Sequence, residues 1–132
     1  MMPMSMLIGL GAAVVLYMVV GFLWYSPMLF GKMWMASMGK TMQDCKMTYM
    51  HLVQAAGVAF VLAFVSAQLL VMTDAHSLAC AVRLGLMLGA VVAASMYSGV
   101  IWAGKNMTAY LVDASCIVVG LVLMNVLLQM LR

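Results

Sequence analysis

Asp113 is the residue of this sequence whose chemistry most needs an explanation. It lies inside an apolar stretch that runs almost to the C-terminus. A carboxylate near the centre of a bilayer costs at least about 2.5–3.5 kcal/mol on insertion scales, so it requires charged or hydrogen-bonding partners. Two interpretations are open: a site that translocates ions or protons, and a structural hub whose hydrogen bonds fix helix packing. We favour the structural hub, because few ionisable groups continue from Asp113 across the membrane.

Few other residues could carry catalytic or metal chemistry. His51 and His76 belong near opposite sides of the expected membrane domain, and the three cysteines form no CxxC pair. Methionine supplies 18 residues, and its soft thioether can bind Cu(I). These methionines are dispersed along the chain, which favours adaptable apolar packing over a copper-binding loop. We therefore expect no enzymatic activity, no cofactor and no bound metal.

The composition excludes a water-soluble monomer. Apolar residues make up 68% of the 132 residues, and only 7% are charged, whereas soluble domains carry roughly 25% charged residues. High hydrophobicity also excludes intrinsic disorder. The net charge of +3 is too scattered along the chain for a nucleic-acid-binding surface.

Four apolar stretches have the length of transmembrane helices, about 20 residues each. They predict an all-α membrane protein, organised as a single domain over residues 1–132, with antiparallel spans at about 4–25, 50–72, 78–103 and 107–131. The long first connection predicts a short interfacial helix at about 27–38. Ser26 would cap this helix, Pro27 would occupy its first position, and Gly39 would end it. Thr41 and Asp44 resemble a capping box for the helix that follows.

Polar side chains fall at two depths when residues are counted along the expected helices at about 1.5 Å per residue. Tyr97, Gln54 and Tyr17 lie near the depth of Asp113, so these four residues are predicted to form an intramembrane polar cluster. Near the side that holds the termini, a second polar level is expected, formed by Arg83, Gln68 and Asn125.

Small residues recur at four-residue spacing along the third span, at Ala81, Gly85, Gly89 and Ala93. In lipid, such faces allow close backbone approach between helices. Two interpretations remain open for this helix-packing face. It packs within the bundle, which we favour, or it forms a groove for a second membrane protein.

The aromatic residues are distributed unevenly between the two sides of the membrane. Trp24, Tyr25, Trp34, Tyr49, Trp102 and Tyr110 all map to the side opposite the termini. Because Trp and Tyr normally line both membrane interfaces, we expect other membrane-protein subunits to cover the side holding the termini and to contact the third span. The remaining surface is expected to face the lipid bilayer.

The segment Gly21-Phe22-Leu23-Trp24-Tyr25-Ser26-Pro27-Met28-Leu29-Phe30-Gly31-Lys32-Met33-Trp34 resembles the signature of an uncharacterised family of small bacterial four-span proteins, domain of unknown function 1761. The resemblance implies four spans and brings no activity or catalytic residues. From the residues themselves, Trp24, Tyr25 and Trp34 form an interface motif with Ser26 and Pro27 that anchors the end of the first span at headgroup level. The methionine content and the shortage of acidic residues depart from bacterial members and indicate a divergent, organellar copy.

The function that we expect is that of a non-catalytic accessory subunit in a larger membrane complex. The specific expectation is a respiratory-chain or ATP-synthase complex of the mitochondrial inner membrane, with the bacterial cytoplasmic membrane as the alternative location. The alternative function is a small homo-oligomeric transporter or channel for ions, protons or solutes, built around Asp113.

Overall fold

The computed structural model describes residues 4–26, 29–39 and 49–131, and all regular structure within these ranges is helical. Four segments are long and apolar enough to cross a membrane, which confirms the predicted all-α membrane architecture. In chain order the helices are α1 (Met4–Trp24), α2 (Gly31–Ser37), α3 (Tyr49–Met72), α4 (Leu78–Met96), α5 (Ser98–Ala103) and α6 (Met107–Leu131).

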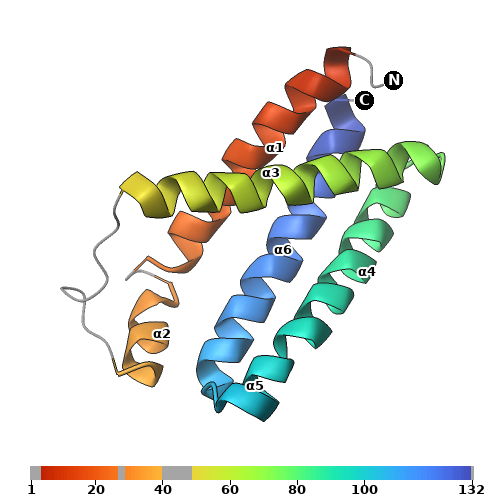
Figure 1. The fold of residues 1–132 in the computed structure, drawn as a ribbon. Coiled ribbons are helices and arrows are strands. Elements are labelled where there is room, and N and C mark those ends of the chain that lie inside the picture. The colour runs from red at the N-terminus through yellow and green to blue at the C-terminus, as the bar shows by residue number, and fades with distance from the viewer. Residues whose placement is uncertain (1–3, 27–28, 40–48, 132) are drawn as a thin grey trace.

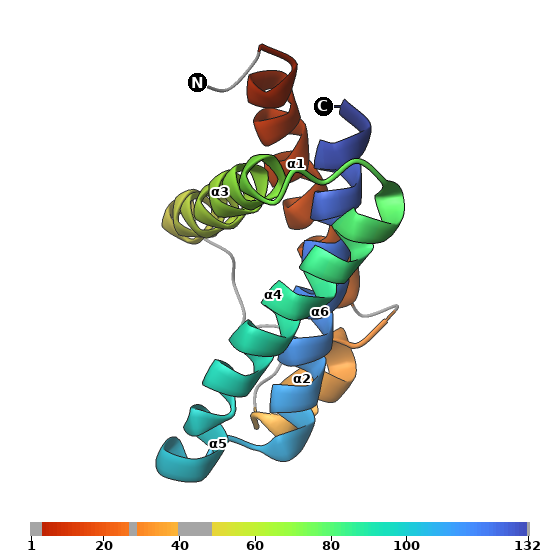
Figure 2. The ribbon, with the colours of Figure 1, turned by 90° about the vertical axis from the view of Figure 1, so that its right-hand side faces the viewer.

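Helix α6 lies between α1 and α4 and runs in the opposite direction to both (Figure 1). The two chain ends lie at the same end of the molecule, which we name the termini end, while α2 and α5 lie at the opposite end (Figures 1 and 2). The third predicted span is divided into α4 and α5 at Tyr97. Gly104 then adopts the left-handed conformation (φ 69°) that allows the chain to turn into α6.

The short helix after the first span begins later than predicted. Ser26 does not cap it: the Ser26 hydroxyl donates to the carbonyl of Leu23 at 2.7 Å, back into α1. Instead, α2 starts at Gly31 after Phe30, which makes no side-chain capping bond. The predicted end is confirmed, because Gly39 has φ 69° and donates to the carbonyl of Ala36. Pro27 and the capping box at Thr41 and Asp44 lie outside the described residues.

Helix α3 departs from the antiparallel arrangement expected of four spans. It crosses α1, α4 and α6 at a steep angle (Figures 1 and 2). None of residues 49–58 is buried, so the buried contacts of α3 all lie in its C-terminal half. Its contact stripe consists mainly of small residues: Ala59, Ala63, Ser66, Ala67 and Leu70. The sequence of α3 does not indicate this crossing, because its few polar residues do not form a continuous face that would show which side packs on the other helices.

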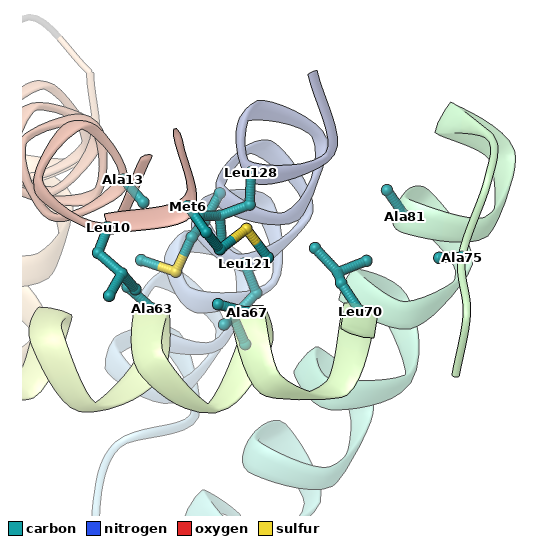
Figure 3. Packing of buried hydrophobic residues seen from close by; sticks show 11 residues of the cluster. Met6, Leu10, Ala13, Ala63, Ala67, Leu70, Ala75, Ala81, Leu121 and Leu128 are labelled. Atoms are coloured by element: carbon teal, nitrogen blue, oxygen red, sulfur yellow. The ribbon is translucent and has the colours of Figure 1, made fainter. Parts of the chain in front are cut away.

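The main apolar core lies at the termini end. Here Met6, Leu10 and Ala13 of α1 contact the small-residue stripe of α3 and the last turns of α6 (Figure 3). Met6, Leu70 and Leu128 are fully buried. Burying apolar side chains in this way gains contact energy between helices even in lipid, because packing rather than hydrophobicity drives their association.

The small-residue face of α4 packs against α6, which decides between the two interpretations of that face. A Cβ atom on Gly85 would lie 2.7 Å from the Val122 Cα, and one on Gly89 would lie 3.1 Å from the Val118 Cα. Ala81 is fully buried. The carbonyl of Ala93 accepts a 2.8 Å hydrogen bond from the Tyr110 hydroxyl. This face is therefore used for packing inside the molecule.

Candidate functional site

The polar site centres on Asp113, in the second turn of α6. The Tyr25 hydroxyl donates a short hydrogen bond to one carboxylate oxygen. The Lys105 ammonium lies 2.5 Å from the other oxygen. The side chains of Lys105 and Asp113 are 29% and 13% exposed, so solvent screens this ion pair only in part. Both carboxylate oxygens are thus engaged, and the charge of Asp113 is neutralised at close range.

Two consecutive residues of the interface motif hold two consecutive residues of α6. Trp24 donates its indole N–H to the carbonyl of Val112 at 3.1 Å, and Tyr25 donates to Asp113. The ring centroids of Phe30 and Trp24 lie 4.9 Å apart. The Trp34 ring meets the Tyr25 ring edge-on, with centroids 5.7 Å apart. These contacts of Trp24, Tyr25, Phe30 and Trp34, which we name the clamp, fasten the end of α1 and the adjoining α2 to the beginning of α6.

The clamp requires glycine at position 31. A Cβ atom there would lie 2.1 Å from the carbonyl oxygen of Tyr25 and 2.7 Å from that of Ser26. The backbone N–H groups of Leu29 and Gly31 both donate to the Ser26 carbonyl, at 3.1 and 3.0 Å. Any larger residue would separate α2 from this turn, and the aromatic contacts of the clamp would be lost.

A cavity of about 560 Å³ lies beside the clamp. Tyr17 and Tyr25 of α1, Trp34 of α2 and His51 of α3 contribute to its walls, and Asp113 contributes from α6. Tyr25 follows the last residue of α1, and burial together with its hydrogen bond to Asp113 raises the pKa of its phenol. Tyr25 therefore keeps its proton and acts as a donor to the carboxylate. The site thus presents a few polar groups on otherwise apolar walls.

A family model described as protein of unknown function DUF1761 matches residues 8–129. The chain belongs to the DUF1761 family. This match covers α2, α3, α4 and α5 completely and most of α1 and α6, and it confirms the resemblance carried by the segment from Gly21 to Trp34. No curated protein and no solved structure matches the chain.

In this DUF1761 chain, one of the three residues expected around Asp113 lines the same cavity and the other two lie elsewhere. Tyr17 lines the same cavity as Asp113. Tyr97 instead packs edge-on against Tyr110, with ring centroids 5.3 Å apart, at the junction of α4 and α5. Gln54 is exposed on the part of α3 that does not contact the core. The bonded partners of the Asp113 carboxylate are Tyr25 and Lys105, not Tyr97 or Gln54.

The second polar level is also arranged differently from expectation. Asn125 is fully buried and donates to the Ser66 hydroxyl at 3.3 Å and to the Leu121 carbonyl at 2.8 Å. Gln68 is half-buried on α3. Arg83 is exposed and lines a separate cavity of about 230 Å³ near the start of α4. Asn125 therefore joins α6 to α3 through Ser66, a residue that the depth count did not place in this level.

Tyr25 and Lys105 are the two partners of Asp113 that the sequence analysis does not predict. The interface motif predicts Tyr25 to be a headgroup anchor, and nothing in the sequence analysis places Lys105 near Asp113. A usable signal for Lys105 existed, because a lysine beside a span can extend its long side chain toward a buried carboxylate within reach. For Tyr25, which is 88 residues from Asp113 along the chain, sequence spacing offered no such signal.

The described residues of this family member contain no group of three or more His, Cys, Asp or Glu side chains that could hold a metal ion. The arrangement that is present combines a neutralised carboxylate, tyrosine hydroxyls and aromatic walls. Such an arrangement is suited to binding and to holding helices together.

Proposed function

We propose that the protein is a non-catalytic accessory subunit of a larger membrane complex. The observation that carries this proposal is the position of α3, which crosses the other long helices and has buried residues in only half of its length. Lipid gives no hydrophobic drive to hold such a helix in place, so its position depends on packing contacts. A neighbouring subunit along the outer side of α3 would supply the contacts that the chain itself does not.

The outer side of α3 carries large side chains suited to such a contact. Phe60 and Phe64 stack with ring centroids 6.2 Å apart, and both are substantially exposed. Aromatic side chains contribute disproportionately to protein interfaces because each buries a large rigid area. The partner expected here is a hydrophobic transmembrane helix of another protein. This surface replaces the small-residue face of α4 as the proposed contact.

The membrane that we propose is the mitochondrial inner membrane, and the complex is one of the respiratory chain or ATP synthase. The composition that motivates this proposal is the 18 methionines and only three acidic residues. The bacterial cytoplasmic membrane is the alternative. Fractionation of the source cells, followed by immunodetection, distinguishes the two locations.

Site-directed photo-crosslinking in native membranes tests the subunit proposal. A photoreactive phenylalanine replaces Phe60 in one variant and Val15 in a control, because both positions are exposed, at 51% and 62%, on different helices. We expect position 60 to crosslink to a different polypeptide and position 15 to give mainly lipid adducts. Lipid adducts alone at both positions, together with migration as a free monomer or small homo-oligomer in native electrophoresis, would refute the proposal.

The second candidate is a small homo-oligomeric transporter or channel built around Asp113. It is favoured by the cavity that reaches this carboxylate. The engagement of both carboxylate oxygens by Lys105 and Tyr25 weighs against it, because a permeating cation would have to displace one of them. Flux measurements in liposomes with the wild type and Asp113→Asn decide the matter: background flux from both proteins excludes transport.

A further inference from the structure

The cavity beside the clamp has walls that are apolar for most of their extent and aromatic at several points. Three helices and the short α2 meet there, and the apolar lining includes Met18, Phe22, Met35, Leu52 and Ala55. Its volume of about 560 Å³ falls within the range of small-molecule sites, roughly 300–1,000 Å³. An apolar cavity with a few convergent polar groups is typical of a ligand site.

One polar group in this cavity has a hydrogen-bonding capacity that the described chain does not use. The Tyr17 hydroxyl makes no hydrogen bond within the described residues, although its ring is half-buried against Gly120. A Cβ atom on Gly120 would lie 2.8 Å from this ring, so the ring is held tightly in place. A hydrogen bond from this hydroxyl to a ligand oxygen would stabilise the complex, because the hydroxyl otherwise lies against an apolar wall without a partner in the described chain.

The charge in the cavity favours a neutral ligand. Asp113 contributes one negative charge, but Lys105 lies 2.5 Å from its carboxylate and contributes one positive charge. The pair therefore presents no net charge to a molecule in the cavity. A cationic ligand would have to compete with Lys105 for the Asp113 carboxylate, and an anionic ligand would face that carboxylate.

We propose that this cavity binds a neutral amphiphile whose flat ring carries hydrogen-bonding oxygens and an apolar tail, the chemistry of membrane quinones. The rings of Tyr17, Tyr25 and Trp34 offer faces and edges on which a flat ring packs favourably. The Tyr17 hydroxyl donates to a ring oxygen, and the tail extends along the apolar lining. This binding site is separate from the outer side of α3 and does not depend on the subunit proposal.

Gly21 allows the cavity to be filled without disturbing the helices. It lines the cavity, and no atom lies within 4 Å of a Cβ atom built on it. Gly21→Leu therefore places a side chain in the cavity at little packing cost. Gly11→Leu is the matched control, because Gly11 lies on the same helix with equally open surroundings and does not line the cavity. Tyr17→Phe removes only the hydroxyl and keeps the ring that packs on Gly120.

Equilibrium binding to the full-length protein in nanodiscs, measured with decylubiquinone, tests the proposal. We expect saturation at one probe per chain and an affinity that Gly21→Leu reduces at least tenfold while Gly11→Leu leaves it within twofold. Loss of the Tyr17 hydroxyl should weaken binding roughly fivefold, as expected for one hydrogen bond. Each variant is first shown to unfold at the midpoint of the wild type.

Two probes with the same ten-carbon tail distinguish the proposed ligand class from other amphiphiles. Decanol is neutral without a ring, and decyltrimethylammonium carries a positive charge. Tighter binding of the ammonium probe would show a cation site and overturn the proposal. Equal binding of decanol and the quinone would show that the ring is not recognised. Quinone binding unchanged in both Gly21→Leu and Tyr17→Phe would place the probe elsewhere and would also overturn it.

Discussion

The two ends of the α1–α6 pair are held together by different interactions. At the termini end, α1, α3 and α6 share an apolar core, and the buried Asn125–Ser66 hydrogen bond lies within it. At the opposite end, hydrogen bonds of Trp24 and Tyr25 join the end of α1 to α6 beside a cavity, and the Lys105–Asp113 ion pair lies next to them at the start of α6. At the first end the helices are held by close apolar packing, and the cavity found there is the smaller one, about 230 Å³ at the start of α4. Directional polar contacts at the second end hold the helices while leaving space between them.

This difference shows how one small chain can combine a rigid part with a binding part. Packing interactions need contact over a large area, whereas an ion pair and a hydrogen bond act at a few points. The polar end therefore tolerates a cavity that would destabilise the core at the other end.

The largest effect is expected where α4 and α6 approach most closely, next to the packed end. Gly85→Leu would force its side chain against the Val122 backbone, 2.7 Å from the position of a Cβ atom. We expect a loss of about 3 kcal/mol in the free energy of unfolding, measured by SDS titration. Gly57→Leu is the control, because no atom lies within 4 Å of a Cβ atom there. Equal stability of the two variants would show that α4 and α6 are not in close contact.

A smaller effect is expected at the polar end. Asp113→Asn removes the ion pair and leaves the half-buried Lys105 without its counter-charge. We expect a loss of about 2 kcal/mol in unfolding free energy, the magnitude of a charged hydrogen bond. If the pair acts as a unit, adding Lys105→Gln should restore part of this loss in a double-mutant cycle. Strict additivity of the two single effects would contradict direct coupling between these residues.

The smallest effect is expected for the polar contact of the packed end. Asn125→Leu replaces an amide with an apolar group of similar size inside a core that is otherwise apolar. Interhelical hydrogen bonds in membrane proteins average about 0.6 kcal/mol, so the expected change is of that order. Combining it with Ser66→Ala removes both partners and should add little. A loss exceeding that of Asp113→Asn would reverse the comparison between the two ends.

The helices of this protein could be predicted from sequence, while their directions could not. Hydropathy located all four long segments, and Gly39 marked the end of α2. The crossing of α3 was not predictable, because an apolar helix without a polar face does not indicate which neighbours it contacts or at what angle. The start of α2 was predicted too early, since Ser26 bonds back into α1 and Gly31 is needed for the tight turn that follows.

The candidate site was predicted in part. Asp113 was identified because an ionisable residue in a span must be explained, and Tyr17 was placed at its depth and lines the same cavity. Depth counting specifies height along a helix but not the side of the helix that faces a neighbour. Tyr97 and Gln54 have suitable heights, yet one packs on Tyr110 and the other is exposed.

By itself, the sequence determined that this chain resides in a membrane, that it contains four long apolar helices, and that Asp113 must have partners. These properties follow from composition and from interactions between residues close together in the chain. Only the tertiary structure decided that Tyr25 and Lys105 are those partners, that the small face of α4 is used internally, and that a cavity remains beside the clamp. The physical reason is that these contacts depend on how each helix is rotated and crossed against its neighbours, which hydropathy leaves open.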